Sequence, residues 1–140
     1  MAKNETIYLP KEANISAQTF INSDSANTLK TIFTPVTEGS QLTGIAVTSG
    51  DTSARVAQLW ITLSGTDYLL ASKSIAAASG TDGSAMTVNL LDGIISPFLK
   101  MDKDGNRYIN LESGQLLKAS FTTQITSGKT ITVTGIGGNY

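Results

Sequence analysis

The sequence predicts an all-β protein, a single β-sandwich of about eight strands with an extended N-terminal arm. From Thr28 onward, short runs rich in β-branched residues alternate with clusters of Gly, Ser and Asp, which is the pattern of an all-β domain. No stretch shows the apolar periodicity of an amphipathic helix of ordinary length. The chain has 140 residues, which is enough for one domain with a real hydrophobic core.

The first 27 residues differ from the rest of the chain because they are polar, with only scattered apolar residues. Pro10 interrupts any early strand. We therefore expect residues 1–27 to be an arm or leader with a possible edge strand around Thr19 to Asn22, and residues 28–140 to be the sandwich domain. An arm of this kind can become ordered only against a partner. Its candidate anchors are Ile7, Tyr8 and Leu9.

Eight segments carry the strand pattern. In chain order they are 28–34, 42–48, 55–63, 68–74, 86–89, 108–111, 116–124 and 129–134. The longest, 55–63, has an aliphatic face that includes Leu59 and an opposite face that includes Trp60. This strand therefore has two apolar faces, which is typical of a central strand or of a contact surface. Ser64 to Asp67 reads as a tight hairpin turn after it.

The connections are predicted from their turn residues. Segment 76–84 is small and polar and is expected to be an exposed loop, 90–99 a short helical turn that closes one end of the core, and 101–106 a turn. The last two strands flank Ser127-Gly128 as a pair. The stretch Gly135 to Tyr140 is expected to fray. Strand spacing fits a Greek-key sandwich and leaves two topologies open, immunoglobulin-like or jelly roll.

Composition argues against an enzyme. Thr (19), Ser (15) and Gly (13) make up 47 residues, whereas charged residues are 15% and His and Cys are absent. Without His, no Ser or Thr has the usual base for nucleophilic catalysis. Acid pairs such as Asp82 with Asp92, or Asp102 with Glu112, could imitate a glycosidase pair, but carboxylates in turns are mostly solvated caps. We expect no enzymatic activity and no cofactor.

The charge and hydropathy patterns exclude other classes of partner. The net charge is −1, so no basic surface is predicted for nucleic acid or for an anionic membrane. No apolar run approaches the roughly 20 residues that span a bilayer. The N-terminus lacks the apolar region of a secretory signal, so we expect the protein to be made in a cytoplasm and kept there, or exported as part of something larger.

One weak metal candidate lies in the turn that begins near Asp102. Carboxylates and amides at alternate positions resemble the start of a calcium loop, and an acidic residue follows seven positions after Gly105. The candidate ligands are Asp102, Asp104, Asn106 and Glu112. The same residues favour a plain turn on backbone grounds, and this is the preferred interpretation. Residues 79–84 lack the Lys of a phosphate-binding loop.

The aromatic residues supply the candidate partner-binding positions. Trp60 stands on the face opposite the aliphatic residues of its strand, and Tyr140 is an anchor-like residue at the end of a Gly-rich stretch. The predicted partner-binding set is Ile7, Tyr8, Leu9, Trp60 and Tyr140.

Several stretches together resemble small β-sandwich proteins encoded among the structural genes of tailed bacteriophages. The resemblance covers roughly residues 28–138. It is carried by Thr28–Phe33, Asp51-Thr52-Ser53-Ala54-Arg55, Gln58-Leu59-Trp60-Ile61-Thr62, Gly80-Thr81-Asp82-Gly83, Asn89-Leu90-Leu91-Asp92 and Thr126–Val133.

The resemblance implies a virion component, most plausibly a decoration (cement) protein on the outside of the capsid. Its partner would be the major capsid protein, and the chain would form a homo-oligomer, with a trimer favoured. A different class remains open, a receptor- or glycan-binding module of a head or tail fibre that uses Trp60 and the tyrosines as stacking platforms. A carboxylate-based hydrolase is a minor third alternative.

Overall fold

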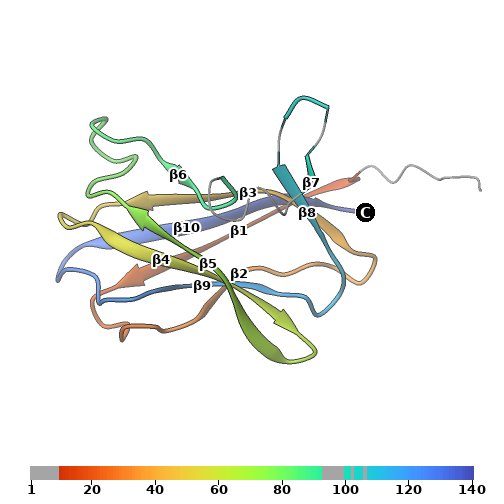
Figure 1. The fold of residues 1–140 in the computed structure, drawn as a ribbon, viewed down its shortest axis with the longest axis horizontal. Coiled ribbons are helices and arrows are strands. Elements are labelled where there is room, and N and C mark those ends of the chain that lie inside the picture. Colours follow the sequence, from red (N-terminus) through yellow and green to blue (C-terminus); the bar gives the residue numbers. More distant parts are fainter. Residues whose placement is uncertain (1–9, 93–99, 102, 106) are drawn as a thin grey trace, which may run out of the picture.

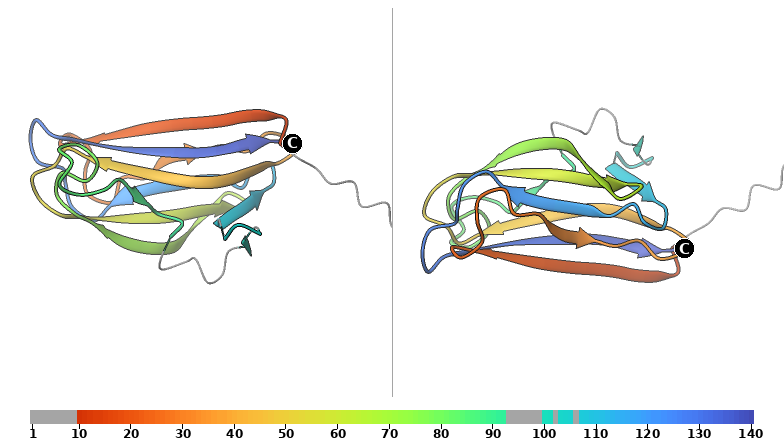
Figure 2. Two further views of the ribbon diagram at one scale, coloured as in Figure 1. Left: turned by 90° about the horizontal axis from the view of Figure 1, so that it is seen from above. Right: turned by 90° about the horizontal axis from the view of Figure 1, so that it is seen from below.

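The computed structural model describes residues 10–92, 100–101, 103–105 and 107–140, and this part of the chain contains ten strands and no helix. The strands form two antiparallel sheets that lie face to face (Figure 1; Figure 2). The predicted all-β sandwich is confirmed. The two strands beyond the predicted eight are β1 (Glu12–Ile21) and β7 (Lys100–Met101).

The first sheet has the order β1-β10-β3-β8-β7, and β6 also pairs with β3. Its further strands are β10 (Thr130–Asn139), β3 (Ser40–Ser49), β8 (Arg107–Leu111) and β6 (Val88–Asn89). The second sheet has the order β2-β9-β4-β5. Its strands are β2 (Lys30–Phe33), β9 (Leu117–Phe121), β4 (Arg55–Leu63) and β5 (Thr66–Ile75).

The strand order resolves the topology that the sequence leaves open. Apart from the short β6 and β7, the two sheets read 1-10-3-8 and 2-9-4-5, so that the chain repeatedly crosses from one sheet to the other. Two interleaved Greek keys with four strands in each sheet define a jelly roll. Among these eight strands, only β4 and β5 form a hairpin between consecutive strands.

The core follows from period-two alternation on the facing sides of the two sheets. On β10, Ile131 and Val133 are fully buried, while the alternating Thr132 and Thr134 are only partly buried. Phe20 of β1 meets Phe121 of β9 edge to face, with ring centroids 4.8 Å apart, and this contact joins the two sheets. All buried side-chain polar atoms in the described residues have a hydrogen-bond partner.

The predicted edge strand near Thr19 to Asn22 is longer and starts earlier. It is β1, which pairs with β10 from Glu12 opposite Asn139 to Ile21 opposite Thr130. Its inner side chains also reach β2, where Ser16 Oγ donates to the Ile32 carbonyl at 2.5 Å. Residues 12–21 are therefore part of the sandwich. The anchors Ile7, Tyr8 and Leu9 lie outside the described residues, and the arm that they belong to stays a prediction.

The prediction of a frayed C-terminal stretch is wrong. Gly135 to Asn139 continue β10, between β1 on one side and β3 on the other. Glycine is required at Gly135 because a Cβ there would lie 2.6 Å from the Ile32 carbonyl oxygen of the opposite sheet. The glycines that suggest flexibility are thus positions where backbones approach closely.

Two further predictions are wrong in part, and a third can be compared with the structure only over its first residues. The segments on either side of Ser127-Gly128 are not paired with each other, because β9 belongs to the second sheet and β10 to the first. Segment 76–84 is not wholly exposed: Ser79 is fully buried, and its carbonyl accepts from the Ser49 amide. In segment 90–99, Leu90 and Leu91 are buried core residues in a turn, and residues 93–99 lie outside the described part.

Candidate partner-binding site

The β4–β5 hairpin is the most apolar exposed part of the second sheet, and it projects past the neighbouring strands (Figure 1). Ser64 and Gly65 make the tight turn, with φ of 50° and 79°. Positive φ at both central residues is what a type I′ hairpin turn needs. Four large apolar side chains near this turn are exposed. They are Leu63, Tyr68, Leu69 and Leu70, which we call the hairpin tip.

The hairpin tip is apolar on both of its faces because consecutive apolar residues of β5 alternate between them, and a register shift adds one more apolar residue. Leu59 pairs with Ala71 and Trp60 pairs with Leu69, so that Leu70 is an additional residue in β5. Leu69 therefore shares a face with Trp60, whereas Tyr68 is opposite Ile61 on the other face. The exposed fractions of Tyr68 and Leu69 are 53% and 47%. Exposed apolar clusters of this kind are typical of protein contact surfaces.

Trp60 is half-buried, and its position on the sheet is fixed. Its indole Nε1 donates to Ser120 Oγ at 3.0 Å, and Ser120 Oγ in turn lies 3.2 Å from Gln58 Oε1. On the same face, Thr62 Oγ1 donates to Asp67 at 2.5 Å, and Lys118 Nζ lies 3.0 Å from Asp67 Oδ1. These hydrogen bonds from Thr62 and Lys118 lower the pKa of Asp67. The contacts of Asp67 thus lie directly beside the turn of the hairpin.

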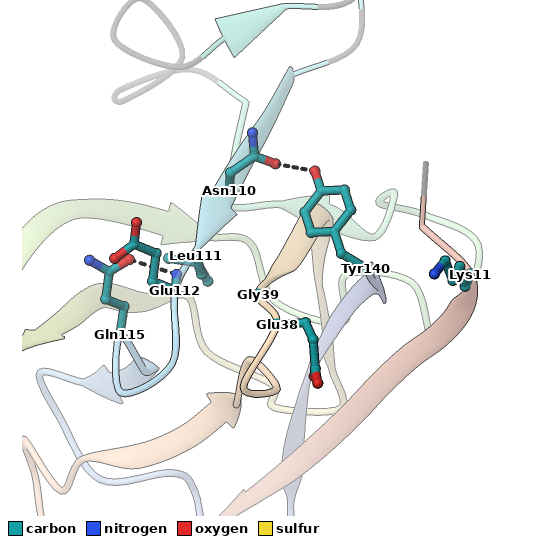
Figure 3. Close-up of a pocket in the computed structure, with 8 residues that line it drawn as sticks. All are labelled: Lys11, Glu38, Gly39, Asn110, Leu111, Glu112, Gln115 and Tyr140. Atoms are coloured by element: carbon teal, nitrogen blue, oxygen red, sulfur yellow. Dashed lines mark hydrogen bonds between the residues drawn. The ribbon is translucent and has the colours of Figure 1, made fainter. Parts of the chain in front are cut away.

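Tyr140 lines a hollow of about 760 Å³ at one end of the sandwich (Figure 3). Its hydroxyl donates to Asn110 Oδ1 at 2.7 Å, and its backbone amide donates to the Gly39 carbonyl at 3.2 Å. Burial and the neighbouring Tyr108 raise the pKa of the Tyr140 hydroxyl, which keeps it protonated. The hollow is lined by Lys11, Glu38, Gly39, Asn110, Leu111, Glu112, Gln115 and Tyr140.

Trp60 and Tyr140, the two predicted partner-binding residues within the described part of the chain, do not lie together. Trp60 belongs to the second sheet, whereas Tyr140 follows the last strand of the first sheet. Of the weak calcium candidates, Asp102 and Asn106 lie outside the described residues, while Asp104 and Glu112 are exposed. Within the described part of the chain, no group of three His, Cys, Asp or Glu side chains could hold a metal ion.

The hairpin tip is the part of this site that the sequence prediction missed. The signal was present, because a Ser-Gly turn is flanked by Leu63 and by three consecutive apolar residues from Tyr68. Consecutive apolar residues in a strand point to both faces, and both can be buried only if the strand is covered on each side.

Asp51 is the most completely buried charged side chain of the described residues. It lies at the end of the sandwich opposite the Tyr140 hollow and holds the loops there together. Its carboxylate accepts from Arg55 Nε at 2.8 Å, from the Ser53 amide at 2.9 Å, and from the amide and hydroxyl of Thr126 at 3.0 and 2.7 Å. The Asp51 carbonyl accepts from the Ala78 amide. This cluster ties the β3–β4, β5–β6 and β9–β10 connections together, which is a structural role.

The Asp51 cluster makes the free energy of unfolding depend on pH in the acidic range. Burial acts to raise the pKa of Asp51, but the hydrogen bonds from Arg55, Thr126 and Ser53 outweigh it and hold the pKa well below the usual value. The stability from this carboxylate is therefore fully present above about pH 4, where the unfolded group titrates, and is lost as the pH falls toward the folded pKa. We expect the difference in unfolding free energy between the wild type and Asp51→Asn to shrink steadily below about pH 4 in urea titrations. A constant difference down to about pH 2 would contradict this.

Comparison with known proteins gives little beyond the fold. No family model matches the chain, and no curated protein matches it. A solved structure that is similar comes from the "Cyanophage Pam1 capsid asymmetric unit", with 9% identity and a TM-score of 0.49. The match covers 100% of this chain and 93% of the other. A likeness of this extent assigns no function. No helix in the described residues could span a membrane.

Proposed function

We propose that this chain is a non-enzymatic structural protein of a bacteriophage virion, a decoration (cement) protein that binds the outer capsid surface. Its partner is the major capsid protein, and it is made in the host cytoplasm and located on the capsid exterior. Three features support the proposal: the resemblance of residues 28–138 to phage structural proteins, a composition without His or Cys, and a jelly roll, a fold that is common in viral capsid domains.

The observation that carries the proposal is the exposed hairpin tip. Leu63, Tyr68, Leu69 and Leu70 project on a hairpin that the Thr62–Asp67–Lys118 contacts hold next to its turn. Apolar side chains on a rigid element lose little entropy on binding, so that they suit insertion between subunits of a shell. The jelly roll behind the tip supplies stability without disulfides.

A charge at the hairpin tip tests the proposal. We expect Leu69→Lys to weaken cosedimentation with shells that lack the protein by about tenfold or more, because a hydrated ammonium group would replace a buried apolar contact. The matched control is Ser74→Lys, since Ser74 is exposed on the same strand but away from the tip. Equal binding by both variants would rule out the hairpin tip as the contact, and a wild type that never binds shells would end the proposal.

A glycan-binding module is the second candidate, and the Tyr140 hollow favours it. The hollow combines an aromatic ring with amide and carboxylate side chains, and its volume lies in the range of small-ligand sites. We expect Tyr140→Ala to abolish any glycan-array signal of the wild type, with Trp60→Ala as the comparison for a site on the other sheet. An array without hits for the wild type would eliminate this candidate.

A further inference from the structure

The outer face of the first sheet carries no charged side chain over three adjacent ten-residue strands. Alternation places every second residue of β1, β10 and β3 on this side, opposite the buried Phe20, Val133 and Val47. We call this surface the neutral face. It consists of Ala13, Ile15, Ala17, Thr19 and Ile21 of β1, Thr132, Thr134 and Ile136 of β10, and Gly44, Ala46 and Thr48 of β3.

The second sheet provides an internal comparison. Its outer side carries the Asp67–Lys118 ion pair, as expected for a solvated sheet face. Around the neutral face, charges occur at the ends of the strands, at Lys11 and Glu12 on one side and Lys129 on the other. An uncharged centre with charges at its margin is the arrangement of a protein–protein interface.

The neutral face is not flat, because it carries a ridge beside two hollows. Ile15 pairs with Ile136 across β1 and β10, and their exposed fractions are 62% and 38%. This ridge borders a hollow of about 190 Å³ that Gly44, Ala46 and Val88 help to line. A second hollow, of about 320 Å³, lies toward the strand ends and is lined in part by Ala13, Gly137 and Gly138. The surface thus presents one aliphatic ridge next to glycine-lined hollows.

The chemistry of the neutral face limits what can cover it. No Lys or Arg lies on it to attract nucleic acid or anionic lipid, and no aromatic ring lies on it to stack on a sugar. The smaller hollow is below the roughly 300 Å³ of small-molecule sites but has room for aliphatic side chains. An uncharged surface also suits a twofold contact, because residues near the twofold axis face their own copies and like charges there would repel.

We propose that the neutral face packs against the neutral face of a second copy of this chain, with the Ile15–Ile136 ridge of each copy in a hollow of the other, which gives a dimer in place of the trimer that the resemblance favours. At about 4.8 Å strand spacing and about 3.3 Å rise per residue, the parts of the three strands that form the neutral face cover roughly 300 Å². Two such faces are smaller than the roughly 1,000 Å² of a stable specific interface, which predicts a weak, concentration-dependent dimer. This contact is independent of the proposed capsid binding, because it uses the opposite sheet.

Two substitutions in the neutral face test the contact by sedimentation equilibrium. We expect the wild type to dimerise at protein concentrations up to about 1 mM, and Ile15→Lys to raise the dimer Kd by about tenfold or more. Gly44→Leu is expected to do the same without a charge, because it fills the hollow that receives the ridge. No heavy atom lies within 4 Å of a Cβ at Gly44, so the fold accommodates the change.

The matched control is Leu69→Lys, a change of similar chemistry on the second sheet. Leu69→Lys is expected to weaken shell binding and to leave the dimer intact. Ile15→Lys is expected to weaken the dimer and to leave shell binding intact. A wild type that stays monomeric, a trimer in place of a dimer, or a dimer that survives both Ile15→Lys and Gly44→Leu would each overturn the proposal. None of these results bears on whether the hairpin tip binds shells.

Discussion

Asp51→Ala is expected to lower the free energy of unfolding by about 3 kcal/mol. The substitution removes four hydrogen-bond acceptor contacts at once and leaves the Arg55 guanidinium, which is largely buried, without its carboxylate. Breaking a buried ion pair from one side is costly because the remaining charge has lost both its water and its partner. Urea denaturation at neutral pH measures the effect directly.

The control for Asp51 is Asp24→Ala. Asp24 also forms an ion pair, with Lys30 Nζ at 2.8 Å, but both side chains are partly exposed. Solvent screens such pairs, so the expected loss is within about 1 kcal/mol. If the two variants lost equal stability, the Asp51 cluster would not be the tie between the three connections that we infer.

Gly135→Ala is expected to destabilise the sandwich by about 3 kcal/mol, the upper part of the usual range for overpacking. The new methyl group would lie 2.6 Å from the Ile32 carbonyl oxygen and 3.1 Å from Phe33 Cβ. Because the nearest atom is backbone, β2 must move, and this movement also strains the hydrogen bond from Ser16 to the Ile32 carbonyl. Thermal and urea unfolding would both report the loss.

Gly44→Ala is the matched control, a glycine of the same sheet with open space around it. Alanine is expected to be neutral there or to stabilise by up to about 1 kcal/mol, because glycine costs entropy in a strand. Stability should be compared at a low protein concentration, where self-association does not contribute. Similar losses for both variants would mean that the sheets do not approach closely at Gly135.

The sequence predicts the elements that depend on local chemistry and misses those that depend on packing between sheets. The bounds of β4 follow from its alternation, and the turn at Ser64-Gly65 follows from its residues. The second half of β10 could not be predicted, because its glycines disfavour a strand locally and are required only by close contacts with Ile32, Gln41 and Pro10. The β9–β10 connection looks like a hairpin because a turn sequence does not reveal which sheet each strand joins.

For the candidate site too, the sequence predicts single residues but not the surfaces that packing creates. Trp60 and Tyr140 are recognisable from the sequence as aromatic residues on unusual segments. The hairpin tip depends on how far β4 and β5 project beyond their neighbours, and the neutral face depends on the alignment of three strands that are distant in sequence. Such alignments arise from the jelly-roll topology, which strand spacing alone does not specify.

The copy number of this protein in purified virions of a phage that encodes it tests the central claim most directly. Quantitative mass spectrometry of intact particles, before and after stripping of the outer surface, measures its ratio to the major capsid protein. A capsid decoration protein is expected in many copies, in a fixed ratio to the major capsid protein, and removable without opening the shell. A handful of copies in the particle, or none, would contradict the account.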